Sequence, residues 1–86
     1  MAQRNSAGHR LRVTREELGM SLRDVHRASA YIARELHNRN FAIPSSRLHF
    51  YETSKSTPSI YRLYTLARLY GRKLTEVLGW YGVPAR

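Results

Sequence analysis

Arginine dominates the side chains of this sequence that could bind another molecule. The chain of 86 residues carries 15 Lys and Arg against 6 Asp and Glu, which gives a formal net charge of +9. Only Lys55 and Lys73 are lysine, and the other basic residues are arginine. A guanidinium presents a planar fork of donors that matches phosphate oxygens and the edge of guanine. This excess predicts a polyanionic partner, most often nucleic acid; the alternative is a basic surface that is merely solvated.

Catalytic and metal-binding residue types occur without the spacing that such chemistry needs. The chain has no cysteine, which excludes disulfides, thiolate metal sites and cysteine nucleophiles. Its four histidines are scattered and lack the i, i+4 spacing of a helical zinc site. A glycine-rich phosphate loop and a convincing nucleophile–base pair are missing as well. We therefore expect no metal, no cofactor and no enzymatic activity.

One acid, Glu52, needs an explanation. It follows Leu48 and Tyr51 on the apolar face of a short predicted helix. A carboxylate beside a core is costly unless an opposite charge pairs with it. The sequence therefore predicts a basic partner for Glu52.

Capping residues and helical periodicity divide the chain into five predicted helices. Ser6 and Ser21 are typical N-caps for helices over residues 7–18 and 22–38, and Asp24 completes a capping box with Ser21. Pro44 and Ser45 open a third helix over 45–53. Thr57 and Pro58 predict the start of a fourth, which Gly71 ends, and Leu74, Val77 and Leu78 indicate a short fifth helix before Gly79.

These elements predict an all-α, single-domain protein. Residues 1–5 are expected to form a flexible arm and residues 80–86 a tail. No apolar run approaches the roughly 20 residues of a membrane span, and no signal-peptide core follows Met1. The expected location is the cytoplasm.

The order of these segments resembles the Cro/repressor-type (XRE, lambda-repressor-like) helix-turn-helix family. The resemblance rests on LRVTREELGMSLRDV (11–25) and IPSSRLHFYETSKSTPSIYRLYTLARLYG (43–71), about half of the chain. It implies a compact five-helix domain in which helix 45–53 reads the major groove of DNA. The base-contacting residues that it implies are Ser45, Ser46, Arg47, His49 and Phe50.

The resemblance also implies residues that hold the DNA backbone and position the reading helix. Phosphate contacts would come from Ser21, Arg23, Lys55, Ser56 and Tyr61. The partner of Glu52 would be Arg15, late in the first helix, in a bidentate ion pair that fixes the angle of helix 45–53.

The sequence departs from the family pattern in the second helix. His26 stands where the family usually has a small residue, and residues 31–42 replace the usual tight turn. The stripe of Ser29, Ile32 and Leu36 predicts that this insertion extends the second helix, away from DNA, and serves protein contact. The candidate residues for a dimer interface are Ile32, Leu36, Tyr64, Trp80 and Tyr81.

The expected function is that of a sequence-specific, double-stranded-DNA-binding transcriptional regulator of bacterial or phage type. A homodimeric repressor is the favoured form, associated with the nucleoid when it is bound. The alternative is a protein-interaction adaptor, or an antitoxin that binds both operator and toxin, built on the same fold.

Overall fold

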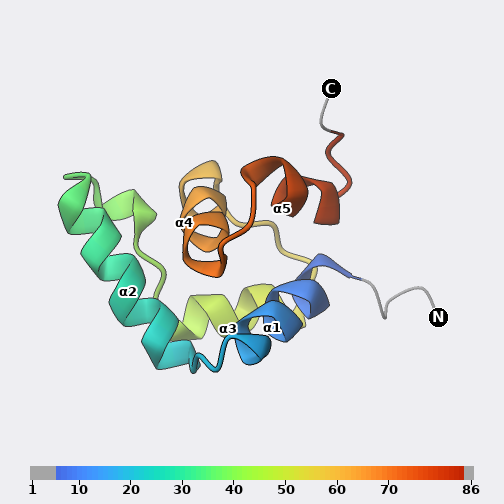
Figure 1. The fold of residues 1–86 in the computed structure, drawn as a ribbon, viewed down its shortest axis with the longest axis horizontal. Helices are drawn as coiled ribbons and strands as arrows, with labels where there is room; N and C mark the ends of the chain where they lie inside the picture. The colour runs from blue at the N-terminus through green and yellow to red at the C-terminus, as the bar shows by residue number, and fades with distance from the viewer. Residues whose placement is uncertain (1–5, 85–86) are drawn as a thin grey trace.

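Five α-helices and one short 3-10 helix build the protein in the computed structural model, which describes residues 6–84 (Figure 1). The elements are α1 (Ala7–Glu17), α2 (Leu22–Glu35), η2 (Arg39–Phe41), α3 (Ser45–Thr53), α4 (Ile60–Tyr70) and α5 (Leu74–Trp80). Residues 6–84 contain no strand, and the predicted all-α architecture of five helices is confirmed. The predicted arm 1–5 and the end of the tail lie outside the described residues. No helix of the described part is long and apolar enough to cross a membrane.

The first two helices begin where their capping residues predict. The Ser6 hydroxyl accepts the backbone N–H of His9 at 3.2 Å. The Ser21 hydroxyl accepts the Asp24 N–H at 3.0 Å, and the Asp24 carboxylate accepts the Ser21 N–H at 2.8 Å. Gly19, at φ +70°, makes the tight turn between the helices, a conformation that glycine adopts without a steric penalty.

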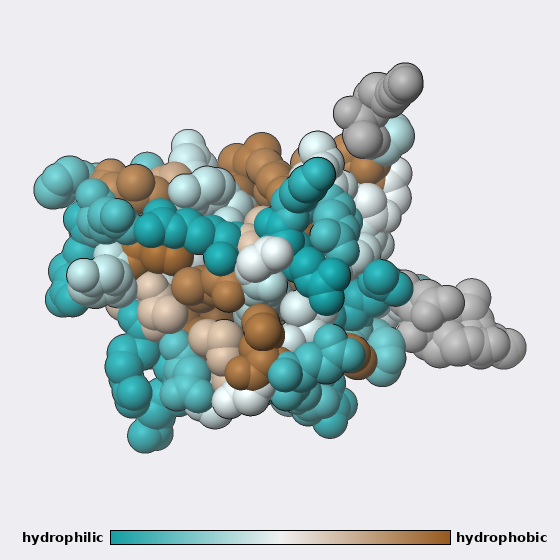
Figure 2. Space-filling view, viewed as in Figure 1, coloured by the Kyte–Doolittle hydropathy of each residue, from teal (hydrophilic) through white to brown (hydrophobic). Residues whose placement is uncertain are grey.

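All five helices contribute to the core. The larger cluster of buried apolar residues contains Leu11, Val25, Ile43, Leu48, Tyr51, Leu66 and Tyr70. A second cluster joins α4 to α5 and consists of Leu63, Ala67 and Val77. On the face shown in Figure 2, apolar residues gather toward the middle and hydrophilic residues surround them. α1 and α3 lie side by side, and α4 packs against α5 and η2 (Figure 1).

The insertion is an ordered return of the chain, and only its first part extends α2. The helix ends at Glu35, three residues before the predicted Asn38, because His37 takes a left-handed conformation at φ +53°. η2 then carries the chain back over α4. The Ser29 hydroxyl accepts the Ile43 N–H at 2.8 Å, and the Thr65 hydroxyl donates to the Phe41 carbonyl at 2.7 Å. The prediction of a helix to Asn38 was therefore wrong.

Four further expectations need correction. α4 begins at Ile60 with Ser59 as its N-cap, because the Ser59 hydroxyl accepts the Arg62 N–H, so Pro58 precedes the helix. Ile60 precedes the buried Leu63 by three residues, a helical spacing that predicts an inward position, but it is 62% exposed. α5 runs through Gly79 to Trp80. His26 causes no crowding, since its exposed ring places Nδ1 3.0 Å from the Ile43 carbonyl oxygen.

Candidate nucleic-acid interface

Helix α3 has one face in the core and one face in solvent. Leu48, Tyr51 and Glu52 are buried, at 0%, 5% and 9% exposure. Ser46, Arg47, His49 and Phe50 are exposed, and Ser45 is half-buried. The alternation follows from helical geometry, because residues three and four apart share a face. Four of the five predicted base-contacting residues are thus together on one accessible surface.

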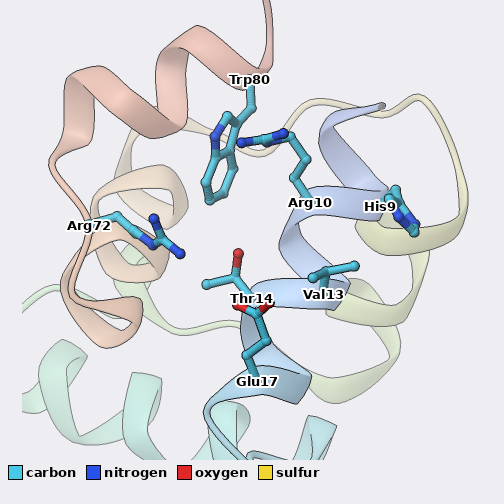
Figure 3. Close-up of a pocket in the computed structure, with 7 residues that line it drawn as sticks. All are labelled: His9, Arg10, Val13, Thr14, Glu17, Arg72 and Trp80. Carbon is cyan, nitrogen blue, oxygen red and sulfur yellow. The ribbon is translucent and has the colours of Figure 1, made fainter. Parts of the chain in front are cut away.

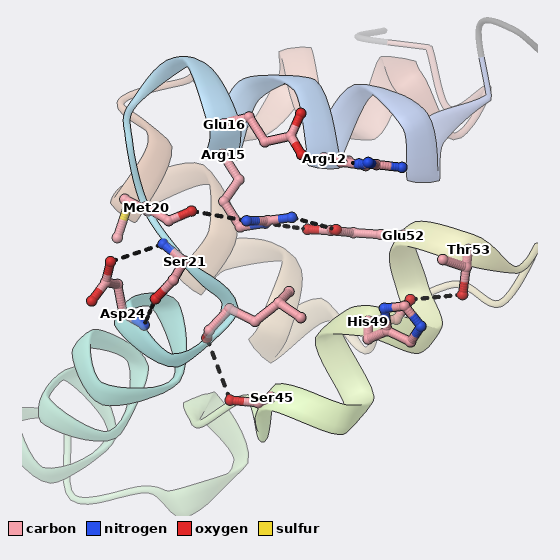
Figure 4. Close-up of polar contacts among 11 residues, drawn as sticks. Arg12, Arg15, Glu16, Met20, Ser21, Asp24, Ser45, His49, Glu52 and Thr53 are labelled. Atoms are coloured by element: carbon pink, nitrogen blue, oxygen red, sulfur yellow. Dashed lines mark hydrogen bonds and ion pairs between the residues drawn. The ribbon is translucent and has the colours of Figure 1, made fainter.

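The predicted ion pair between Arg15 and Glu52 is present and bidentate (Figure 4). Arg15 Nε donates to Glu52 Oε2 at 2.7 Å, and Arg15 Nη2 donates to Glu52 Oε1 at 2.9 Å. Arg15 Nη1 donates to the Met20 carbonyl at 2.8 Å. The hydrogen bond to Glu52 raises the pKa of Arg15 despite the opposing effect of burial. One guanidinium therefore ties α1 to α3 and to the turn that precedes α2.

Gly8 allows α1 and α3 to approach closely. A Cβ at this position would lie 2.6 Å from the Tyr51 carbonyl oxygen and 2.8 Å from the Glu52 carbonyl oxygen. Side chains do not fit in that space, so only glycine permits this packing. Gly8 precedes Leu11 by three residues on the inward stripe, a spacing from which this role could have been inferred. At the other end of α3, the Ser45 hydroxyl donates to the Leu22 carbonyl at 3.4 Å.

Two of the α3 residues predicted to contact bases, Arg47 and Ser45, make contacts within the protein. The Arg47 guanidinium lies 5.4 Å from the centre of the Phe50 ring, close enough for a cation–π contact. Phe50 is 44% exposed, so its ring and the Arg47 guanidinium lie next to each other on the solvent-exposed surface. The hydroxyl of Ser45 is directed at α2, which favours a positioning role for this residue. Ser46 and His49 extend the same surface.

The predicted phosphate-contacting residues lie in separate places. Ser21 uses its N–H and its hydroxyl oxygen in the capping box. Its backbone N–H is therefore not free to bond a phosphate. The bonds from Ser21 lower the pKa of Asp24, which places an ionised acid at this end of α2. Arg23 and Lys55 are exposed, and Ser56 is half-buried with its N–H bonded to the Ser54 hydroxyl at 3.2 Å.

Tyr61 belongs with the insertion. Its ring packs edge-on against Phe41 of η2, with centroids 5.2 Å apart, and Tyr64 packs on the same ring at 5.5 Å. The structure therefore groups Tyr61 with residues of η2 and α4, and does not group it with the exposed surface of α3.

The five candidate residues for a dimer interface divide into buried and exposed sets. Ile32 is 3% exposed, so the expectation that it needs an apolar partner from another subunit is wrong. Trp80 and Tyr81 are half-buried and pack against the chain's own core. Leu36 and Tyr64 remain open to solvent, at 38% and 37% exposure.

Arg62 is a structural residue that the sequence did not indicate. Its Nε donates to the Ala42 carbonyl at 2.9 Å, and its Nη1 donates to the Tyr51 hydroxyl at 3.0 Å. It thereby connects the returning insertion with the inner face of α3. No local pattern marks such a residue, because both partners are distant in sequence.

Comparison of the chain with protein-family models, with curated proteins and with solved structures gave no match. The fold and the exposed surface of α3 therefore define the class of protein. The chain is a small all-helical domain with a net charge of +9, and an arginine-bearing helix is held at its surface by a buried ion pair. In the part of the chain described, no three potential metal ligands lie together.

Proposed function

We propose that this protein is a sequence-specific regulator of transcription that reads the major groove of double-stranded DNA with α3. The observation that carries the proposal is the exposed surface of Ser46, Arg47, His49 and Phe50 on a helix whose inner face is fixed by Arg15 and Glu52. A reading helix must hold its angle so that side chains meet base edges in register. The buried bidentate pair supplies that rigidity.

Arg47 is the principal base reader in this proposal. Its fork can bind guanine O6 and N7 together, while Phe50 beneath it limits the directions that the side chain takes. Arg23 and Lys55, which are exposed at the start of α2 and after α3, hold phosphates. The favoured form remains a homodimeric repressor in the cytoplasm, associated with the nucleoid when bound, and its function requires no cofactor and no catalysis.

Selection of bound duplexes from a random pool tests the proposal. The wild-type chain is expected to enrich a defined motif, and Arg47→Ala is expected to lose preference at one position, a cost of about 1–3 kcal/mol. Arg23→Ala should weaken all duplexes alike and lower the salt slope by about one unit. The matched control is Arg34→Ala, an exposed arginine in the last turn of α2. No enrichment by the wild-type chain at low salt would refute the proposal.

A second candidate function, that of an adaptor or antitoxin, is favoured by a different surface. Exposed apolar residues occur near the end of α2 and along α4, namely Tyr31, Leu36, Ile60, Tyr61 and Tyr64. Surfaces of this kind mark protein contacts when they are contiguous. Salt-sensitive, sequence-selective duplex binding distinguishes the regulator from the adaptor, and sedimentation of the Leu36→Asp, Tyr64→Asp double variant tests whether this surface is a dimer seam. A loss of self-association with half-site DNA binding intact supports a dimer seam there; unchanged self-association excludes it.

A further inference from the structure

A cavity of about 250 Å³ lies between α1 and the α4–α5 side of the molecule, away from the candidate nucleic-acid interface (Figure 3). α1 contributes Arg10, Val13, Thr14 and Glu17 to its lining, and the opposite wall carries Arg72 and Trp80. Gly8 and Arg15 of α1 face α3. At 100° per residue, Arg10, Val13 and Glu17 point to the other side of the helix. The cavity is thus separate from the surface that would read DNA.

The cavity contains charges of both signs together with an aromatic wall. The Arg10 guanidinium lies 5.3 Å from the centre of the Trp80 ring. Arg72 Nη1 bonds Glu76 at 2.9 Å, and its remaining donors point toward the cavity. Glu17 supplies a carboxylate to the lining. Val13 and the Trp80 indole add apolar surface.

Thr14 supplies an unused polar group inside the cavity. It is 5% exposed, and its hydroxyl forms no hydrogen bond with another residue between 6 and 84. In Figure 3 the hydroxyl points toward Trp80 and into the space between the two arginines. Among the described residues, the buried side-chain oxygens without a partner are those of Tyr70 and Tyr81, so the Thr14 hydroxyl borders the open space of the cavity. It is therefore available to bond a polar group of a ligand.

We propose that this cavity binds a free α-amino acid with a medium-sized apolar side chain, an activity that does not depend on DNA binding. The ligand carboxylate bonds the guanidinium groups of Arg10 and Arg72, and its ammonium bonds Glu17. The Thr14 hydroxyl bonds the ligand's charged end, and the side chain packs on Val13 and Trp80. A simple anion would meet Glu17, and a neutral molecule would lack the opposite charges with which a zwitterion can bond both kinds of group. At roughly 30 Å³ per water, the cavity holds the equivalent of about eight water molecules, which suits leucine or methionine.

Trp80 makes the test direct, because it is the only tryptophan in the chain. The intact protein is titrated with L-leucine and L-methionine while indole fluorescence is recorded. A saturable change with half-saturation at or below about 1 mM is expected, within the range of weak specific ligands. N-acetyl-L-leucine lacks the ammonium and L-leucinamide lacks the carboxylate. Each is expected to bind at least roughly tenfold more weakly, as for a lost charged hydrogen bond.

Variants on α1 test whether leucine binding depends on the residues of the cavity or only on the charge of the surface. Arg10→Gln and Glu17→Gln should each weaken leucine binding roughly tenfold or more, and Thr14→Val should weaken it roughly threefold or more. The controls are Arg12→Gln and Glu16→Gln, which alter an exposed pair on the same helix outside the cavity. They should leave binding unchanged. NMR of the unmodified chain adds a readout that needs no variant: the Trp80 indole and Thr14 amide signals should shift with leucine.

Four results would overturn the proposal. They are the absence of a saturable response to both amino acids, equal binding of the acetyl and amide derivatives, an equal loss in the control variants, and a response to inorganic phosphate that matches leucine. None of these results bears on whether α3 binds DNA.

Discussion

Replacing Glu52 by alanine is expected to remove much of the stability of this domain. The Glu52 side chain as a whole is 3% exposed, and its carboxylate makes bonds of 2.7 and 2.9 Å to Arg15, whose side chain is 10% exposed. Without it, the guanidinium stays near the core with the Met20 carbonyl as its remaining bonded partner among the described residues. Breaking a buried pair in this way costs about 3–5 kcal/mol. A chain of this length has a free energy of unfolding of about 4–13 kcal/mol.

A thermal melt followed by circular dichroism measures the effect. In a domain this small, each kcal/mol shifts Tm by about 4–8 °C, so Glu52→Ala should lower Tm by about 12 °C or more. Glu16→Ala is the matched control. It breaks the Arg12–Glu16 pair, whose 3.1 Å contact joins side chains that are 57% and 53% exposed. Exposed pairs of this kind contribute about 0–1 kcal/mol. Equal melting of the two variants would refute the argument from burial.

A double substitution isolates the stranded charge as the cause. Arg15→Met with Glu52→Leu replaces the pair by apolar side chains of similar length. Removing both charges of a buried pair is often neutral or stabilising. The double variant should therefore melt above Glu52→Ala, and a cycle completed by Arg15→Met and Glu52→Leu should give a coupling energy of about 2 kcal/mol or more. If it melts as low as the single variant, the loss arises from repacking and not from an unpaired guanidinium.

Other substitutions test the packing and the caps. Gly8→Ala should destabilise by about 1–3 kcal/mol in denaturant melts because its Cβ would lie 2.6 Å from the Tyr51 carbonyl oxygen. Gly79 has open space around it, so Gly79→Ala is the control and should stabilise by about 0.5–1 kcal/mol. If Gly8→Ala left the stability unchanged, that result would contradict the close approach of α1 and α3. Tyr70→Phe should raise Tm, because the Tyr70 hydroxyl is buried without a partner in the described structure; a lower Tm would mean that the hydroxyl is bonded. The hydrogen bonds from Ser21 lower the pKa of Asp24 in the folded state, so its stabilising effect is present above the ordinary pKa of an aspartate and is lost as the pH falls through the lowered pKa. Stability measured from about pH 6 to about pH 3 should fall less steeply in Asp24→Asn, and an unchanged slope would exclude this role.

Features fixed by local chemistry were predictable from the sequence. The Ser6 cap, the Ser21–Asp24 capping box and the bounds of α3 depend on neighbouring residues, and the structure has them as expected. The partner of Glu52 lies 37 positions away. Family resemblance identified Arg15, and the cost of a lone buried acid explains why a partner was needed.

Features that depend on the return of the insertion could not be predicted. The stripe that includes Ile32 shows an apolar face but not what covers it, because periodicity is the same for an intramolecular and an intermolecular partner. The covering depends on His37 taking a positive φ and on the Ser29 hydroxyl binding the Ile43 N–H. Neither residue is a typical turn signal. The sequence shows Ser29 only as a small polar residue on the apolar face of a helix. Its hydroxyl accepts the N–H of Ile43, which lies 14 positions further along the chain.

Arg62 connects the insertion with α3. η2 rests on α4 through Thr65 and through the Phe41 ring, and three residues join it to the start of α3. The Arg62 guanidinium adds a further link, since it bonds the Ala42 carbonyl and the Tyr51 hydroxyl together. A protein that displaced the return segment would have to break the first bond, and the second partner sits one position before Glu52. The angle of α3 is therefore supported from α1 by the ion pair and from α4 by Arg62.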